Sequence, residues 1–119
     1  MTINNIEIDI DFTDADVIER IEKGCEKLYQ EAEELKKLQK EDENFNTAEG
    51  IRQECKIIKD FFDYVLGEGT SEKIFNGKDS LNLCLKAYED IVEERDKQLN
   101  DFNNRVGSYS PDRLKRWTY

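Results

Sequence analysis

The sequence has no histidine, one proline and one methionine. Without histidine, Ser-His-Asp and Cys-His nucleophilic systems and histidine-ligated metal sites are excluded. The three cysteines are far apart in the chain and form no Cys-x-x-Cys motif, so a disulfide framework is not expected. No apolar run approaches the roughly 18–20 residues that cross a membrane, and the first residues lack the regions of a signal peptide. We therefore expect a cytoplasmic protein with no membrane partner.

Charge dominates what the sequence does contain. Of its 119 residues, 39% are charged and the net charge is −10, whereas about 25% is usual in globular domains. An excess of acids argues against binding to duplex nucleic acid, which needs cations. The net charge is −9 over residues 1–50, −4 over residues 51–104 and +3 over residues 105–119. This predicts a single acidic helical domain over residues 1–107 and a basic, aromatic C-terminal tail over residues 108–119.

A strand is predicted near residues 5–12, where isoleucine and phenylalanine alternate with acidic residues. One strand cannot satisfy its own backbone donors and acceptors, so it needs a partner. A turn at Asn4 and Asn5 would pair it with residues 1–3 in a hairpin, and pairing with a second copy of the chain is the other arrangement.

Helices are predicted near residues 14–40, 47–66 and 80–105, with a short one near residues 71–76. Their apolar residues recur in steps of three and four, the spacing of a heptad seam. The fold class is therefore mainly α: three long amphipathic helices plus a short helix, with a short N-terminal β-strand or hairpin. Gly24 costs about 1 kcal/mol in a helix relative to alanine, which suggests a close helix crossing there. The expected core residues are Ile21, Leu28, Ile51, Cys55, Ile58, Phe62, Phe75, Leu81, Leu85, Tyr88 and Val92.

Two groups of residues resemble chemical sites but fit structural roles better. Cys25, Cys55 and Cys84 each lie on the apolar stripe of a different predicted helix. Three thiolates can bind zinc, but buried cysteine usually packs as a small hydrophobic residue. Adjacent carboxylates such as Glu33 and Glu34 point about 100° apart on a helix, as expected on any strongly charged amphipathic helix. We therefore predict no catalytic residue, no metal and no cofactor, and a protein that is not an enzyme.

Several segments are similar to a known group of proteins. They are INNIEIDIDFTDAD at 3–16, TAEGIRQECKIIKDFFDYVLGEGT at 47–70, SEKIFNG at 71–77, LNLCLKAYEDIV at 81–92 and YSPDR at 109–113. These segments resemble small phage and prophage proteins of Gram-positive hosts, in the group that looks like tail assembly chaperones of long-tailed phages. The resemblance covers nearly the whole chain. Nothing is distinctive over residues 22–46, and residues 114–119 depart from the group by adding aromatic residues to the basic run.

The resemblance implies a non-enzymatic assembly factor in the cytoplasm of the host cell. Such chaperones coat the long, hydrophobic tape-measure protein and keep it soluble until tail-tube subunits polymerise around it. The implied partner is thus the tape-measure protein, and tail-tube proteins and a second copy of the chain remain open as further partners. The charge supports a second hypothesis: a small acidic phage-encoded inhibitor of a host defence nuclease, which presents carboxylates in place of phosphates.

The predicted partner-binding site lies in the basic tail. It consists of Tyr109, Ser110, Pro111, Arg113, Lys115, Arg116 and Trp117. Aromatic residues and arginine are the types most enriched at binding hot spots, and the Tyr-Ser-Pro-Asp-Arg motif belongs to the resemblance. The competing interpretation is that residues 105–119, with a net charge of +3, are attracted to the acidic rest of their own chain.

Truncation after Gly107 distinguishes these interpretations. If the tail binds the partner, the shortened protein should melt at nearly the same temperature and lose its client or its self-association. A lower melting temperature with intact binding would show that the tail is structural.

Overall fold

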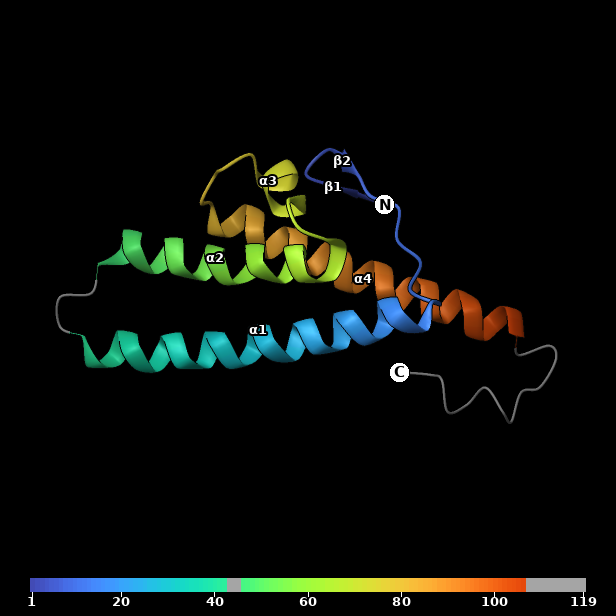
Figure 1. The fold of residues 1–119 in the computed structure, drawn as a ribbon, viewed down its shortest axis with the longest axis horizontal. Coiled ribbons are helices and arrows are strands. Elements are labelled where there is room, and N and C mark those ends of the chain that lie inside the picture. Colours follow the sequence, from blue (N-terminus) through green and yellow to red (C-terminus); the bar gives the residue numbers. More distant parts are fainter. Residues whose placement is uncertain (43–45, 107–119) are drawn as a thin grey trace.

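The computed structural model describes residues 1–42 and 46–106, and within them the fold is mainly helical (Figure 1). In chain order the elements are β1 (Thr2–Ile3), β2 (Ile6–Glu7), α1 (Ala15–Glu41), α2 (Thr47–Leu66), α3 (Thr70–Phe75) and α4 (Leu81–Val106). Three long helices, one short helix and an N-terminal hairpin confirm the predicted fold class. Helix α1 runs antiparallel to α2, α4 crosses behind them, and α3 and the hairpin lie along one edge.

Side chains before two of the helices define where these helices begin. The carboxylate of Asp14 accepts a hydrogen bond from the amide of Asp16 at 2.9 Å, and the side chain of Asn46 accepts one from Glu49 at 2.7 Å. Each bond satisfies an amide that lacks a partner inside its helix. The short helix α3 is fixed differently, because the carboxylate of Asp63 on α2 accepts bonds from both the amide and the hydroxyl of Ser71.

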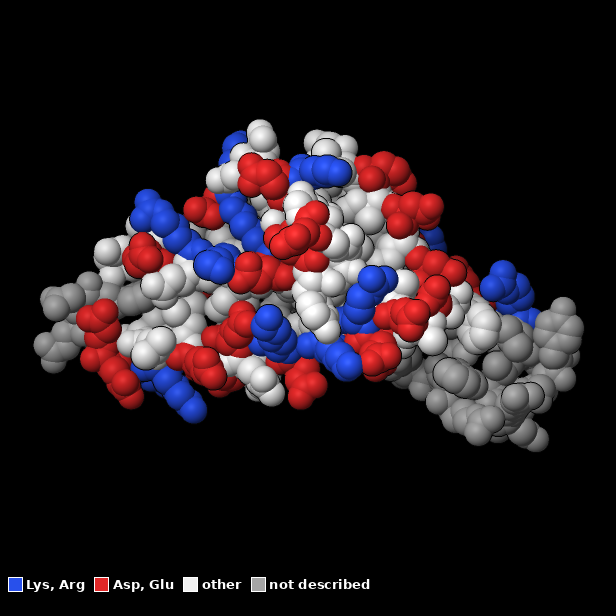
Figure 2. Space-filling view, in the orientation of Figure 1, with Lys and Arg blue, Asp and Glu red and all other residues white. Residues whose placement is uncertain are grey.

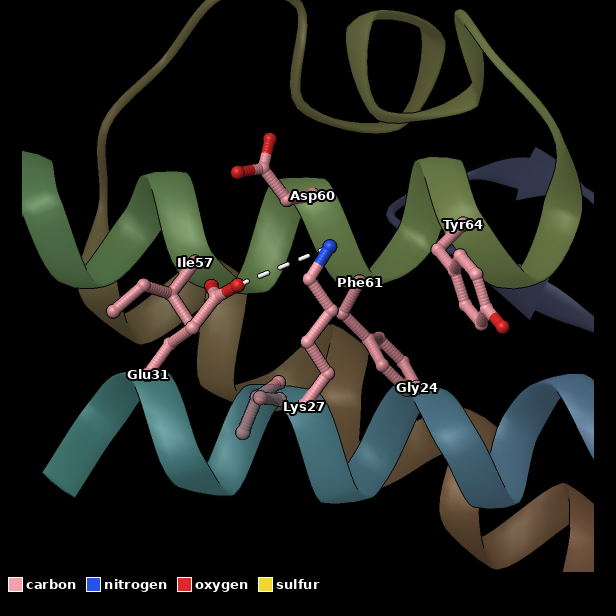
Figure 3. A pocket seen from close by; sticks show the side chains of 8 residues that line it. Gly24, Lys27, Glu31, Ile57, Asp60, Phe61 and Tyr64 are labelled. Carbon is pink, nitrogen blue, oxygen red and sulfur yellow. Dashed lines mark ion pairs between the residues drawn. The ribbon is translucent and has the colours of Figure 1, made fainter. Parts of the chain in front are cut away.

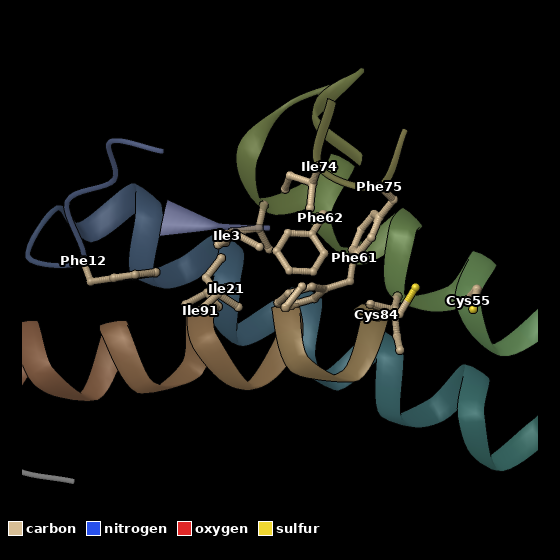
Figure 4. Packing of buried hydrophobic residues seen from close by; sticks show 13 residues of the cluster. Ile3, Phe12, Ile21, Cys55, Phe61, Phe62, Ile74, Phe75, Cys84 and Ile91 are labelled. Atoms are coloured by element: carbon tan, nitrogen blue, oxygen red, sulfur yellow. The ribbon is translucent and has the colours of Figure 1, made fainter. Parts of the chain in front are cut away.

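The hydrophobic core is built around α2, which packs against α1 and α4 and is covered by α3. Aromatic rings meet edge to face at its centre, with ring centroids 5.4 Å apart for Phe61 and Phe62 and 5.6 Å apart for Phe62 and Phe75 (Figure 4). The centroids of Phe61 and Tyr88 are 5.2 Å apart. Of the predicted core residues, Ile21, Cys55, Ile58, Phe62 and Phe75 are buried. Partly buried and packed against this core are Leu28, Ile51, Leu81, Tyr88 and Val92.

The prediction that Leu85 belongs to the core is wrong, because its side chain is 46% exposed. Helix α4 instead buries Cys84, Ala87 and Ile91 completely. The sequence pattern is ambiguous here, since α4 has two neighbouring apolar stripes and the core covers only one of them.

The predicted strand over residues 5–12 is too long, because β2 contains only Ile6–Glu7. The hairpin pairing is confirmed: Ile3 lies opposite Ile6 and Thr2 opposite Glu7, and the turn residues Asn4 and Asn5 have positive φ angles.

Beyond β2, an amide side chain takes the place of a neighbouring strand. Gln98 of α4 accepts a hydrogen bond from the backbone amide of Phe12 at 2.7 Å and donates one to the carbonyl of Ile10 at 2.9 Å. The predicted strand therefore obtains part of its backbone pairing from a helix.

The expected close crossing occurs at Gly24, where α1 meets α2. A Cβ atom at this position would lie 2.9 Å from Cγ2 of Val65 and 3.2 Å from the ring of Phe61. Both neighbours are almost fully buried, and valine is restricted to few rotamers in a helix.

Gly24→Ala should therefore destabilise the protein. Overpacking costs about 1–3 kcal/mol, and it opposes a gain of about 1 kcal/mol in helix propensity. We expect a net loss of about 1 kcal/mol, measured by denaturant unfolding. Glu34→Ala, at an exposed position of α1, is the control and should change stability little. A more stable Gly24→Ala protein would contradict the close crossing.

Gln98→Glu should destabilise the protein by about 1–3 kcal/mol at neutral pH, because a carboxylate cannot donate to the carbonyl of Ile10. Protonation restores the donor, so the deficit relative to the wild type should shrink as the pH falls through the folded-state pKa of the new carboxyl group. Gln30→Glu, on the exposed face of α1, serves as control in the same urea melts. If both substitutions lowered the stability equally, Gln98 would form no stabilising hydrogen bonds with the backbone.

Candidate partner-binding surface

The seven residues of the predicted binding site, Tyr109, Ser110, Pro111, Arg113, Lys115, Arg116 and Trp117, lie outside the described residues. The same is true of the tail proposed over residues 108–119. Both therefore stay predictions. The part of the chain that is described offers a different candidate, on α1 and α4.

Helix α4 carries a second apolar stripe at the edge of the core, which we call the outer stripe: Leu81, Leu85, Tyr88 and Val92. Its steps of four, three and four residues are those of a heptad seam. Leu85 is exposed and the other three side chains are partly buried. The outer stripe therefore lies beside the buried stripe of Cys84, Ala87 and Ile91, and Leu85 is its exposed member.

Two contacts show how α1 lies beside the outer stripe. The hydroxyl of Tyr88 donates to Sγ of Cys25 at 3.6 Å, and Gln98 binds the backbone at Phe12, just before α1. Because the α4 residue number falls as the α1 number rises, the two helices run antiparallel. In this antiparallel arrangement Tyr29 follows Cys25 by four residues on α1, and Leu85 precedes Tyr88 by three residues on α4.

Tyr29 and Leu85 extend the apolar area across both helices. The side chain of Tyr29 is 66% exposed, and it follows Cys25 by four residues, so the two share one face of α1. We call Tyr29 together with the outer stripe the α1–α4 surface. Two of the four large hydrophobic side chains that are exposed in the described chain belong to it, the others being Leu38 and Tyr64.

Acidic side chains flank the α1–α4 surface on both helices. On α1, Glu26 and Glu33 lie three residues before and four residues after Tyr29; on α4, Glu89 lies four residues after Leu85, and Asp96 four after Val92. All four side chains are exposed or half-buried, so they meet solvent at the rim. The surface thus combines an apolar centre with a negatively charged border.

The pocket between α1 and α2 in Figure 3 is too small for a ligand. It lies beside Gly24, is lined by Lys27, Glu31, Asp60 and Tyr64, and has a volume of about 10 Å³, room for about one water molecule. The ammonium of Lys27 and the carboxylate of Glu31 are 3.9 Å apart across its mouth. This pocket is a small gap between the packed side chains of α1 and α2.

A wider cleft of about 530 Å³ lies between the hairpin turn, the end of α3 and α4. Asn5, Asn76, Lys78 and Lys86 line it, and all four are exposed. Because these lining side chains are polar and solvated, the cleft resembles an open polar surface.

The cysteines occupy packing positions. Cys55 and Cys84 are fully buried next to each other, and Cys25 is half-buried. Burial raises the pKa of the Cys55 thiol and raises the pKa of Cys84 to about 12, so both are neutral at physiological pH and are poor nucleophiles. Burial also raises the pKa of Tyr88 to about 12, and its bond to Cys25 adds to this. Among residues 1–42 and 46–106, no group of three or more carboxylates and thiols is arranged to hold a metal ion.

The described residues thus form a mainly helical fold that carries an apolar surface with an acidic border. The chain belongs to a family of unknown function, DUF6673, whose model matches residues 4–119. Comparisons with curated proteins and with solved structures gave no match. Within the described residues, none of the helices combines the length and the apolar character needed to cross a membrane.

Proposed function

We propose that this protein is a phage tail assembly chaperone-like protein, which binds and solubilises the tape-measure protein during tail morphogenesis in the host cytoplasm and catalyses no reaction. The observation that carries the proposal is the α1–α4 surface, where Leu85 and Tyr29 are exposed beside partly buried apolar side chains at heptad spacing. The resemblance of the sequence to the chaperone group adds the identity of the client.

The geometry of the outer stripe suits a helical client. Apolar residues in steps of four and three pack against a second helix, and an apolar helix that docks on such a face is a common mode of recognition. Burying the exposed part of Leu85 would contribute about 1 kcal/mol. The net charge of −10 would help to keep a complex with an apolar client in solution.

The described charges give less support to the second hypothesis, a nuclease inhibitor that mimics nucleic acid. Such a mimic needs a field of unpaired carboxylates, but acidic and basic side chains are interspersed on the face in Figure 2. Many are paired within one helix, such as Glu19 with Lys23 at 2.7 Å and Asp60 with Lys56 at 2.9 Å. We therefore favour the chaperone.

Co-expression with the tape-measure protein of the same phage or prophage tests the proposal. The wild-type chain should move the tape-measure protein into the soluble fraction, and Leu85→Asp should reduce this several-fold by placing a charge in the apolar surface. Leu38→Asp is the matched control: Leu38 is 62% exposed on α1 but lies nine residues after Tyr29, on the opposite face of the helix. It should behave as the wild type does.

Two results would contradict the proposal in different ways. Equal activity of the Leu85→Asp and wild-type proteins would show that the client binds elsewhere, for example at the C-terminal tail. An insoluble tape-measure protein in the presence of the wild-type chain would reject the chaperone function, and recovery of a host nuclease with the chain would then favour the inhibitor.

A further inference from the structure

The border of the α1–α4 surface indicates the chemistry of its partner. We propose that this surface docks an amphipathic helix of another protein, in which an apolar stripe is flanked by lysine or arginine residues. This inference rests on the proposed function, which requires a helical client. It adds the sign of the charge that the client's flanking residues must carry.

The apolar part of the argument comes from the shape of the surface. The side chains of Leu85 and Tyr29 are exposed, and Tyr88, three residues after Leu85, donates to Cys25, four residues before Tyr29. A helix lying over the seam can therefore contact both side chains with one face, at i, i+3, i+4 and i+7 positions.

The charged part of the argument comes from the border. Glu26 and Glu33 flank the surface on α1, and Glu89 and Asp96 flank it on α4. Two of these carboxylates have a cation beside them, since Lys36 lies 3.8 Å from Glu33 and Arg95 lies 3.1 Å from Asp96. Four carboxylates against these two cations leave a net charge of −2 on the border.

Such a border selects partners by charge. A docked helix with acidic flanks would place like charges side by side on both edges, whereas basic flanks would meet carboxylates on α1 and on α4. Charges at the rim of an interface mainly set the association rate and exclude wrong partners, while the apolar centre provides most of the affinity. The affinity for a basic-flanked helix should therefore fall as the salt concentration rises.

Two fluorescent peptides of about 20 residues test this chemistry by titration with the full chain. Both carry the same leucine stripe at helical spacing, one with lysine and the other with glutamate beside it, and a scrambled lysine peptide lacks the stripe. We expect the lysine-flanked peptide to bind at least tenfold more tightly than either of the others at low salt. The difference from the glutamate peptide should shrink as salt screens the charges.

Variants of the chain test whether the peptide binds at the α1–α4 surface. Leu85→Asp should weaken binding of the lysine-flanked peptide at least tenfold, with Leu85→Ser as a second variant should aspartate lower the melting temperature. Leu38→Asp should bind within about twofold of the wild type, since it adds the same charge on the opposite face of α1. The double variant Glu89→Lys, Asp96→Lys should narrow or reverse the preference between the two flanked peptides.

Equal binding of the lysine and glutamate peptides would overturn the assignment of a basic partner. Unchanged binding by both Leu85 variants would also overturn it, because the lysine peptide would then be held elsewhere on the acidic protein. The peptides contain no tape-measure sequence, so the two proposals fail separately. Peptide binding without co-solubilisation would reject only the tape-measure client, and co-solubilisation without a charge preference would reject only the basic character of the docked helix.

Discussion

The close approach of α1 to α2 at Gly24 is the contact on which the rest of the structure depends. With no side chain at Gly24, Phe61 and Val65 of α2 lie directly against the backbone of α1. The ring of Phe61 then meets Phe62 and Tyr88 at the same time. One glycine thus sets the depth at which α2 packs and, through the contact of Phe61 with Tyr88, the position of α4. A larger residue would displace a row of stiff, buried side chains, which cannot move independently in a close-packed core.

This packing also explains why α4 has an apolar side left over. Helix α2 and strand β1 pack against α4, whose residues Cys84, Ala87 and Ile91 are fully buried. Helix α1 reaches α4 through the long side chain of Tyr88, so side chains bridge the seam between these two helices. When the apolar side of a helix is wider than the neighbouring helix can cover, part of that side stays exposed. The part that remains exposed is the α1–α4 surface.

The helices and the hairpin follow from local physics, and the sequence predicts them well. Apolar residues in steps of three and four, capping residues such as Asn46 and the Asn4-Asn5 turn act over a few residues, so they can be read without knowledge of the fold. The replacement of a strand by Gln98 could not be predicted, because the amide and its backbone partners lie 86 and 88 residues apart. A single polar residue on an amphipathic helix gives no sign of such a distant role.

The candidate surface could not be predicted for a related reason. The heptad steps of Leu81, Leu85, Tyr88 and Val92 indicate that these residues pack against a helix, but the steps are the same whether that helix belongs to the chain or to a partner. The second stripe one position earlier, Cys84, Ala87 and Ile91, is the sign that α4 has more apolar area than an amphipathic helix of a small domain needs. Composition points instead to the basic tail, because a change in the sign of the charge is easier to see in a sequence than a surplus of apolar positions.

The contacts between α1 and α4 therefore differ in strength from one end of the two helices to the other. At one end Gln98 ties α4 to the segment before α1 by two hydrogen bonds, and in the middle Tyr88 reaches Cys25. At the other end Tyr29 and Leu85 are exposed. Two short, directional bonds resist separation more than a single weak contact to sulfur does, so the seam is most easily adjusted where its apolar residues meet solvent. A docking helix would find its apolar contacts at this adjustable end, while the hydrogen-bonded end maintains the register of the two helices.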